Sequence, residues 1–172
     1  MSTINFTLRH FRKGDEPSLA ANINGKDIER YTLHIPYPYT LENARQWVSL
    51  NIKNDRDKAA AMRNFVIDLD GQVIGSVGLS GIRGHLAEIG YWLGKDYWGC
   101  GITTAAVKMA TEYAFKELGL RRVYARVIPA NKASSSVLKK SGYKYEGLMR
   151  KQGMKRGKPV DLQLFAKTRW EK

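Results

Sequence analysis

A Gly-Cys-Gly sequence at residues 99–101 separates two segments of different pattern. The preceding AEIGYWLG is a short apolar run typical of a strand, and residues 102–118 carry apolar side chains at helical spacing before Gly119. Glycine lets backbone approach a ligand closely, and a helix N-terminus has unpaired N–H groups, so this unit predicts an anion site. It lacks the Gly-Lys-Ser/Thr of a Walker loop and the third glycine of a Rossmann turn.

The first half of the chain predicts strands and helices in alternation. INFTLRHF is an opening strand, and the acidic start of GDEPSLAANIN suits a helix N-terminus. IPYPYT is predicted to be an extended loop, after which Thr40 caps a helix that ends near Asp55. NFVIDLDGQVIGSVGLS predicts two strands joined at Asp70-Gly71, a strong hairpin signal.

The second half continues this alternation. HLAEIGYWLG predicts a strand before the glycine turn, and residues 122–128 predict another strand after the helix at 102–118. A short helix is expected at about 132–140, with Gly142 at its C-terminal end and a further strand beyond.

Length and composition indicate one domain spanning residues 1–172, expected to be soluble and cytoplasmic. Hydrophobic residues make up 43% of the chain, but no apolar run approaches the length of a membrane span, and the N-terminus does not resemble a signal peptide. A single cysteine excludes an internal disulfide, and three scattered histidines offer no ligand spacing, so no metal is expected.

The charge is concentrated in the last third of the chain. Residues 1–115 hold 13 basic and 12 acidic side chains, whereas residues 116–172 hold 16 basic and 4 acidic ones. This asymmetry indicates an anionic partner, such as a nucleotide, an acidic peptide or RNA, or a solvated basic surface that serves solubility.

Two segments, AEIGYWLGKDYWGCGITTAAV and VIPANKASSSVLKKSGYKYEG, resemble the cofactor-binding segments of the GNAT family of N-acetyltransferases. YTLHIPYPYTLENARQWV and PVDLQLFAKTRW resemble the acceptor-side loop and helix and the last strand of its ribosomal-protein and N-terminal amine branch. The resemblance implies a mixed α/β fold with about seven strands and four helices, splayed between the fourth and fifth strands. Relatives of this branch are often homodimers, so a homodimer is expected.

The resemblance implies that acetyl-CoA lies in the splayed cleft and is the acyl donor. Its pantetheine arm would pair with the backbone of Tyr91, Trp92 and Leu93. Its pyrophosphate would rest on the backbone N–H groups of Trp98, Gly99, Cys100, Gly101, Ile102, Thr103 and Thr104. Asn131 matches the asparagine that binds the pantetheine amide, and Ser134 matches a serine near the sulfur. Trp98 and Thr103 depart from the family's glycine-turn motif.

Direct transfer needs a base for the amine and a donor to the leaving thiolate. Glu88 is the candidate base, acting through water, and its alternative is a surface carboxylate. Relatives often place a tyrosine acid where this chain has Leu138, so Ser134 is the substitute donor, unless it serves only to position CoA or the helix. Cys100 is interpreted as a turn residue rather than a nucleophile.

The acceptor is expected to be a protein or peptide N-terminal α-amine. Deprotonating an amine of pKa about 8 at pH 7 costs about 1.4 kcal/mol, against nearly 5 kcal/mol for lysine, so one weak base suits the α-amine. His34, Tyr37 and Tyr39 are candidate acceptor contacts, as are Lys155 and Arg156 in a basic segment expected to connect the last two strands. The alternatives are a small-molecule amine, or a non-catalytic RNA- or ribosome-binding module.

Overall fold

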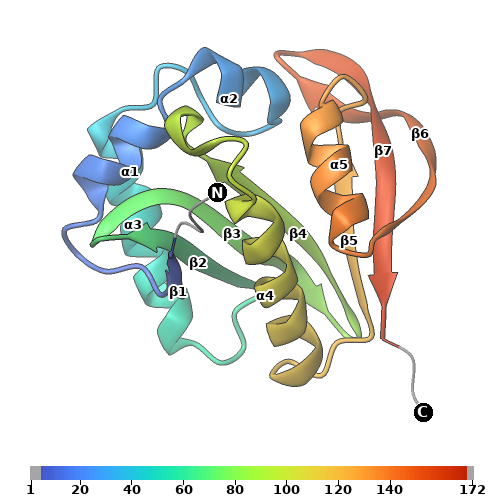
Figure 1. The fold of residues 1–172 in the computed structure, drawn as a ribbon, viewed down its shortest axis with the longest axis horizontal. Helices are drawn as coiled ribbons and strands as arrows, with labels where there is room; N and C mark the ends of the chain where they lie inside the picture. The colour runs from blue at the N-terminus through green and yellow to red at the C-terminus, as the bar shows by residue number, and fades with distance from the viewer. Residues whose placement is uncertain (1–4, 170–172) are drawn as a thin grey trace.

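The computed structural model describes residues 5–169, which form one seven-stranded mixed sheet (Figure 1). The strand order is β1-β2-β3-β4-β5-β7-β6, and only β4 and β5 pair in parallel. The strands are β1 (Thr7–Arg9), β2 (Met62–Leu69), β3 (Gln72–Arg83), β4 (Leu86–Leu93), β5 (Arg122–Val127), β6 (Lys144–Lys155) and β7 (Lys158–Thr168). The expected mixed α/β fold and strand number are confirmed.

Helices cover both faces of the sheet. They are α1 (Glu16–Ile23), α2 (Lys26–Tyr31), α3 (Leu41–Arg56), α4 (Ile102–Lys116) and α5 (Lys132–Lys140), with a 3-10 turn η1 (Lys95–Tyr97). Helix α2 was not predicted, because six residues are too few to display a helical period in the sequence. It begins after Gly25 and ends at Tyr31, because the extended backbone of Thr32 stops it.

Two local predictions are confirmed at the residues that produce them. Asp70 and Gly71 both have positive φ, 51° and 81°, and form the two-residue turn between β2 and β3. Such a turn matches the right-handed twist of the paired strands. Thr40 caps α3 by accepting from the Asn43 backbone N–H at 3.1 Å, and the Asn43 side chain accepts in return from the Thr40 N–H.

The segment predicted to connect the last two strands is itself largely strand. Strand β6 continues to Lys155, and β7 begins at Lys158 after a turn at Arg156 and Gly157. Because β6 lies at the edge of the sheet, polar side chains occupy both of its faces, and register shifts near Gly153 interrupt its alternation. The period-2 pattern was therefore absent from the sequence.

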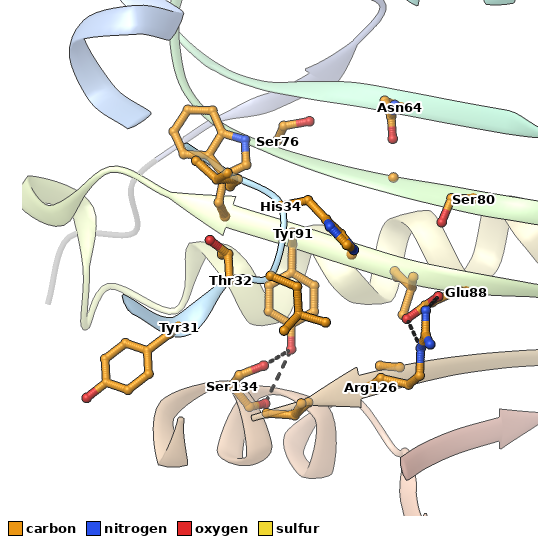
Figure 2. Close-up of a pocket in the computed structure, with 18 of the residues that line it drawn as sticks. Tyr31, Thr32, His34, Asn64, Ser76, Ser80, Glu88, Tyr91, Arg126 and Ser134 are labelled. Carbon is orange, nitrogen blue, oxygen red and sulfur yellow. Dashed lines mark hydrogen bonds and ion pairs between the residues drawn. The ribbon is translucent and has the colours of Figure 1, made fainter. Parts of the chain in front are cut away.

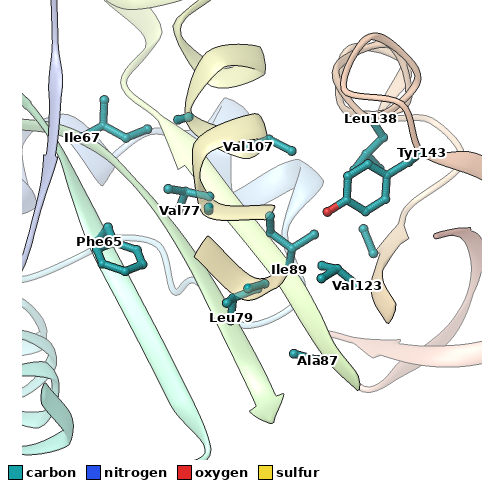
Figure 3. Packing of buried hydrophobic residues seen from close by; sticks show 14 of the residues in the cluster. Phe65, Ile67, Val77, Leu79, Ala87, Ile89, Val107, Val123, Leu138 and Tyr143 are labelled. Atoms are coloured by element: carbon teal, nitrogen blue, oxygen red, sulfur yellow. The ribbon is translucent and has the colours of Figure 1, made fainter. Parts of the chain in front are cut away.

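The core is divided between the two faces of the sheet. On one face α4 packs over β3 and β4, and Figure 3 shows Phe65, Val77, Leu79 and Ile89 among the buried side chains there. On the other face α1 and α3 cover β2 and β3 through a second buried cluster, which includes Leu19, Val48 and Val66. Along β2, Phe65 and Ile67 belong to the first cluster and Val66 to the second, so side chains alternate between the two faces and the sheet separates the clusters.

The sheet opens between β4 and β5. Their parallel pairing covers only Leu86–Glu88 against Arg122–Tyr124, so the remaining residues of β4 present a backbone edge that β5 does not cover. The expected splay between the fourth and fifth strands is confirmed. This opening places the C-terminal half of β4, the start of α4 and the start of α5 around one space.

Candidate active site

Two cavities meet where β4 and β5 separate. The first, of about 450 Å³, is lined by His34, Trp47, Asn64, Glu88 and Arg126 among others. The second, of about 240 Å³, is lined by Leu93, Trp98, Gly99, Thr103 and Val137 among others. Six residues line both: Tyr31, Thr32, Tyr91, Trp92, Asn131 and Ser134. A molecule in one cavity can therefore touch a molecule in the other beside these shared residues.

The glycine turn forms one end of the second cavity. Gly99 and Gly101 both have φ of 78°, a left-handed conformation that favours glycine, and an added Cβ on either would point into open space. Gly101 is the N-cap of α4, and no side chain caps the helix there. The first-turn N–H groups are consequently available to a ligand, as the strand–turn–helix pattern predicts.

The other residues of this turn have different environments. The Trp98 indole N–H donates to the Leu93 carbonyl at 2.8 Å, which fixes the ring at the rim of the cavity. Ile102 is buried in the core, and Cys100 is exposed. The Thr104 carbonyl accepts from the Ser141 hydroxyl. Within residues 5–169 no group of histidine, cysteine or acidic side chains could hold a metal.

Ser134 and Tyr91 form a hydrogen-bonded pair at the junction of the cavities (Figure 2). The Tyr91 hydroxyl lies 2.8 Å from Ser134 Oγ and donates to the Ser134 carbonyl at 3.3 Å. Burial raises the pKa of Tyr91 well above its ordinary range, so the phenol keeps its proton. Asn131 caps α5 by accepting from the Ser134 N–H at 3.0 Å, which fixes the serine backbone.

Sequence reasoning assigned Tyr91 only a backbone role. Its alternation with Trp92 places its side chain on the face of the sheet that α4 covers, but the contact with Ser134 joins residues 43 positions apart. No local pattern indicates a contact of that range, which depends on how far β4 and β5 separate.

Glu88 lies in the first cavity and forms a two-fold ion pair with Arg126 (Figure 2). Arg126 Nε donates to Glu88 Oε1 at 2.8 Å, and Nη2 donates to Oε2 at 2.7 Å. The hydrogen bonds to Glu88 raise the pKa of Arg126, so the guanidinium stays charged. The sequence pointed to Glu88 but not to its partner, which is one of many cations in the basic last third.

The candidate acceptor contacts separate into two groups. His34 lines the first cavity. Tyr39 is buried in the core beneath α1 and α3, and burial raises the pKa of its hydroxyl. Tyr37 is exposed beside Lys26, and neither tyrosine lines either of the two cavities. The peptide bond between Tyr37 and Pro38, in the loop before α3, is cis.

Lys155 and Arg156 are paired within the protein. Lys155 Nζ donates to Glu29 Oε1 at 2.9 Å and to the Glu29 and Thr32 carbonyls at 2.6 and 2.7 Å. Arg156 donates to Glu29 Oε2 at 2.7 Å. These hydrogen bonds, that from Lys155 foremost, lower the pKa of Glu29. The tip of the β6–β7 hairpin is thus bound to the end of α2, and neither cation lines either of the two cavities described above.

Comparison with known proteins agrees with this geometry. Residues 5–144 match the family model described as an acetyltransferase (GNAT) domain. The chain is 39% identical to the probable N-acetyltransferase YjcK of Bacillus subtilis over 74% of this chain and 72% of the relative. It is 31% identical to the spermidine N(1)-acetyltransferase of Escherichia coli over 72% of this chain and 64% of the relative. The chain therefore belongs to the GNAT family of acetyltransferases.

Solved structures show the same architecture. The ribosomal-protein-S5-alanine acetyltransferase of Vibrio fischeri superimposes with a TM-score of 0.86 at 24% identity, covering 100% of this chain and 98% of that one. Mycobacterium smegmatis RimJ, in complex with CoA-disulfide, superimposes with a TM-score of 0.82 at 28% identity, covering 94% and 80%. In residues 5–169 no helix is long and apolar enough to cross a membrane.

Proposed function

We propose that this protein is an acetyl-CoA-dependent N-acetyltransferase that modifies the N-terminal α-amine of a protein or peptide. The observation that carries the proposal is the pair of joined cavities, one beside a bare helix N-terminus and the other beside a carboxylate. Two substrates placed in these cavities would meet at Ser134 and Tyr91 and could react directly.

The second cavity suits acetyl-CoA. The open N–H groups at the start of α4 would hold the pyrophosphate, with Gly99 and Gly101 leaving room for it. The pantetheine arm would follow the uncovered edge of β4 past Leu93 and bring the thioester to Ser134. The CoA-disulfide in the related RimJ structure supports this class of ligand.

The acetyl transfer then follows from the groups at the junction. The neutral amine attacks the thioester carbonyl, a C–N bond forms, and the C–S bond breaks to release the CoA thiolate. Glu88 takes a proton from the amine through water. Tyr91 keeps its one hydroxyl hydrogen, and turning that hydrogen from the Ser134 carbonyl to Ser134 Oγ leaves the serine hydrogen free to donate to the departing sulfur. Ser134 thereby stabilises negative charge without ionising.

The charge of the first cavity favours an α-amine over a polyamine. Glu88 is the one acidic side chain among the lining residues, and Arg126 already neutralises it. Spermidine, the substrate in the name of one relative, carries further cations that would need carboxylates to hold them. An N-terminal amine has an ordinary pKa of about 8 and needs no such partners, and it deprotonates at a cost of about 1.4 kcal/mol at pH 7.

An acceptor panel tests the proposal. Purified protein and acetyl-CoA are mixed with peptides bearing a free N-terminus, the same peptides with a blocked N-terminus and a free lysine, spermidine, or an aminoglycoside, and thiol release is followed. We expect turnover with free N-termini and little with the blocked peptides. Faster turnover with spermidine would refute the acceptor assignment, and no thiol release with any amine would refute the enzymatic proposal.

A further inference from the structure

Gly78 and Gly90 form a notch in the floor of the first cavity, and the side-chain amide of Asn64 lies beside it. Asn64 on β2, Gly78 on β3 and Gly90 on β4 are neighbours across the sheet, and all three line this cavity. The two glycines leave bare backbone beside Asn64. An ideal Cβ on Gly78 would lie 1.6 Å from Asn64 Oδ1, so the amide oxygen occupies the space above Gly78.

A chain of hydrogen bonds from α3 fixes the orientation of this amide. The Trp47 carbonyl can only accept, and Asn51 Nδ2 donates to it at 2.8 Å. Asn51 must therefore present Oδ1 on its other side, where Asn64 Nδ2 donates to it at 2.8 Å. Asn51 is 1% exposed and Asn64 is 8% exposed, so water does not compete freely for these bonds.

This polarity determines what Asn64 offers to the cavity. With its NH₂ group committed to Asn51, its oxygen is the group that faces the notch, and Figure 2 shows that oxygen directed toward β3. The neighbouring Ser76 donates its hydroxyl to the Phe65 carbonyl, and each Glu88 oxygen accepts one hydrogen bond from Arg126. Asn64 thus presents a neutral, directed hydrogen-bond acceptor in the floor of the cavity.

We propose that Asn64 Oδ1 binds an N–H of the attacking amine and positions it over the Gly78–Gly90 notch; this inference rests on the proposed N-acetyltransferase function. A carboxylate in the same place would stabilise the ammonium form and raise the pKa of the bound amine. A carbonyl oxygen holds the N–H without that penalty, so the amine remains nucleophilic. Asn64 lines the first cavity and not the second, so its effect is confined to the acceptor.

Three variants test this assignment with steady-state kinetics against an active peptide. Asn64→Leu should raise KM for the peptide about three- to tenfold, the value of one hydrogen bond, with KM for acetyl-CoA unchanged. Asn64→Asp should move the acid limb of the kcat profile to higher pH, because its carboxylate stabilises the ammonium ion of the bound acceptor. A merely structural role would not move that limb.

The double variant Asn51→Leu with Asn64→Leu separates recognition from folding. Asn64→Leu alone leaves the buried Asn51 oxygen without its donor and lowers Tm, whereas replacing both partners restores much of the Tm. We expect the peptide KM to stay raised in the double variant. A peptide KM equal to wild type in Asn64→Leu, or restored in the double variant, would overturn the inference. Inactive wild-type protein would instead refute the proposed function.

Discussion

The link between the β6–β7 hairpin and α2 yields a quantitative prediction. Lys155→Met keeps most of the side-chain volume. It removes the positive charge and the three hydrogen bonds that Lys155 Nζ donates to Glu29 and Thr32. Removing one partner of a fully buried ion pair costs about 3–5 kcal/mol. Here the two side chains are 17% and 11% exposed, and Arg156 still pairs with Glu29. We therefore expect a loss of about 2 kcal/mol, discounted for solvent screening.

Thermal unfolding followed by circular dichroism measures this loss. For a chain of 172 residues, about 2 kcal/mol corresponds to a fall in Tm of about 4–8 °C. Lys158→Met is the matched control, because Lys158 is exposed and lies opposite Lys155 at the same hairpin turn. It should change stability by less than about 0.5 kcal/mol. Equal Tm values for the two variants would show that the contact between Lys155 and Glu29 does not stabilise the fold.

The same pair predicts a pH dependence. The hydrogen bond from the Lys155 side chain, together with the positive charges of Lys155 and Arg156, lowers the pKa of Glu29 below its ordinary 4.5 in the folded protein. As the pH falls, Glu29 is protonated in the unfolded chain at a higher pH than in the folded protein. The stabilisation is therefore present above pH 4.5 and is lost as the pH falls through the lowered pKa of the folded state. The difference in Tm between wild type and Lys155→Met should accordingly narrow below pH 4.5.

Three further predictions concern the active site. Gly101→Val should abolish acetyl-CoA binding measured by calorimetry. Gly119→Val is the control and should keep binding, because it carries the same positive-φ strain beyond the other end of α4. Equal binding by both variants would contradict the assignment of the pyrophosphate to the glycine turn. Glu88→Gln should lower kcat, because the base is lost. The double variant Glu88→Gln with Arg126→Gln should not recover kcat, since recovery would mean that Glu88 serves only as the counterion of Arg126. Tyr91→Phe should slow turnover, and the loss should be smaller when the acetyl donor is a thioester of a more acidic thiol, because that thiolate needs less stabilisation as it leaves. An equal loss with every donor would show that Tyr91 does not assist the departure of the sulfur.

Much of the fold follows from local chemistry in the sequence. Asp70-Gly71 supplies the two positive φ values that a two-residue hairpin needs, and Thr40 supplies a cap for α3. Gly101 marks the start of α4 because only glycine readily adopts its left-handed backbone there. Each of these signals is complete within four residues, so it can be recognised without knowing the tertiary structure.

The interactions that complete the site could not be predicted in this way. Tyr91 meets Ser134 across 43 positions, and Asn51 meets Asn64 across a helix–strand interface. Lys155 binds Glu29 across 126 positions, which the basic composition of the last third did not indicate. Pairings of this range depend on strand order and on the opening of β4 from β5, so they appear only once the chain is folded.

A competition experiment shows in one reaction which amine the protein acetylates. The protein is incubated with acetyl-CoA and an equimolar mixture of spermidine and one peptide that carries both a free N-terminus and a lysine. Mass spectrometry with peptide fragmentation then locates the acetyl group. We expect a single acetyl group, on the peptide α-amine, as the proposed function requires. Acetylation mainly of spermidine or of the lysine side chain would contradict it.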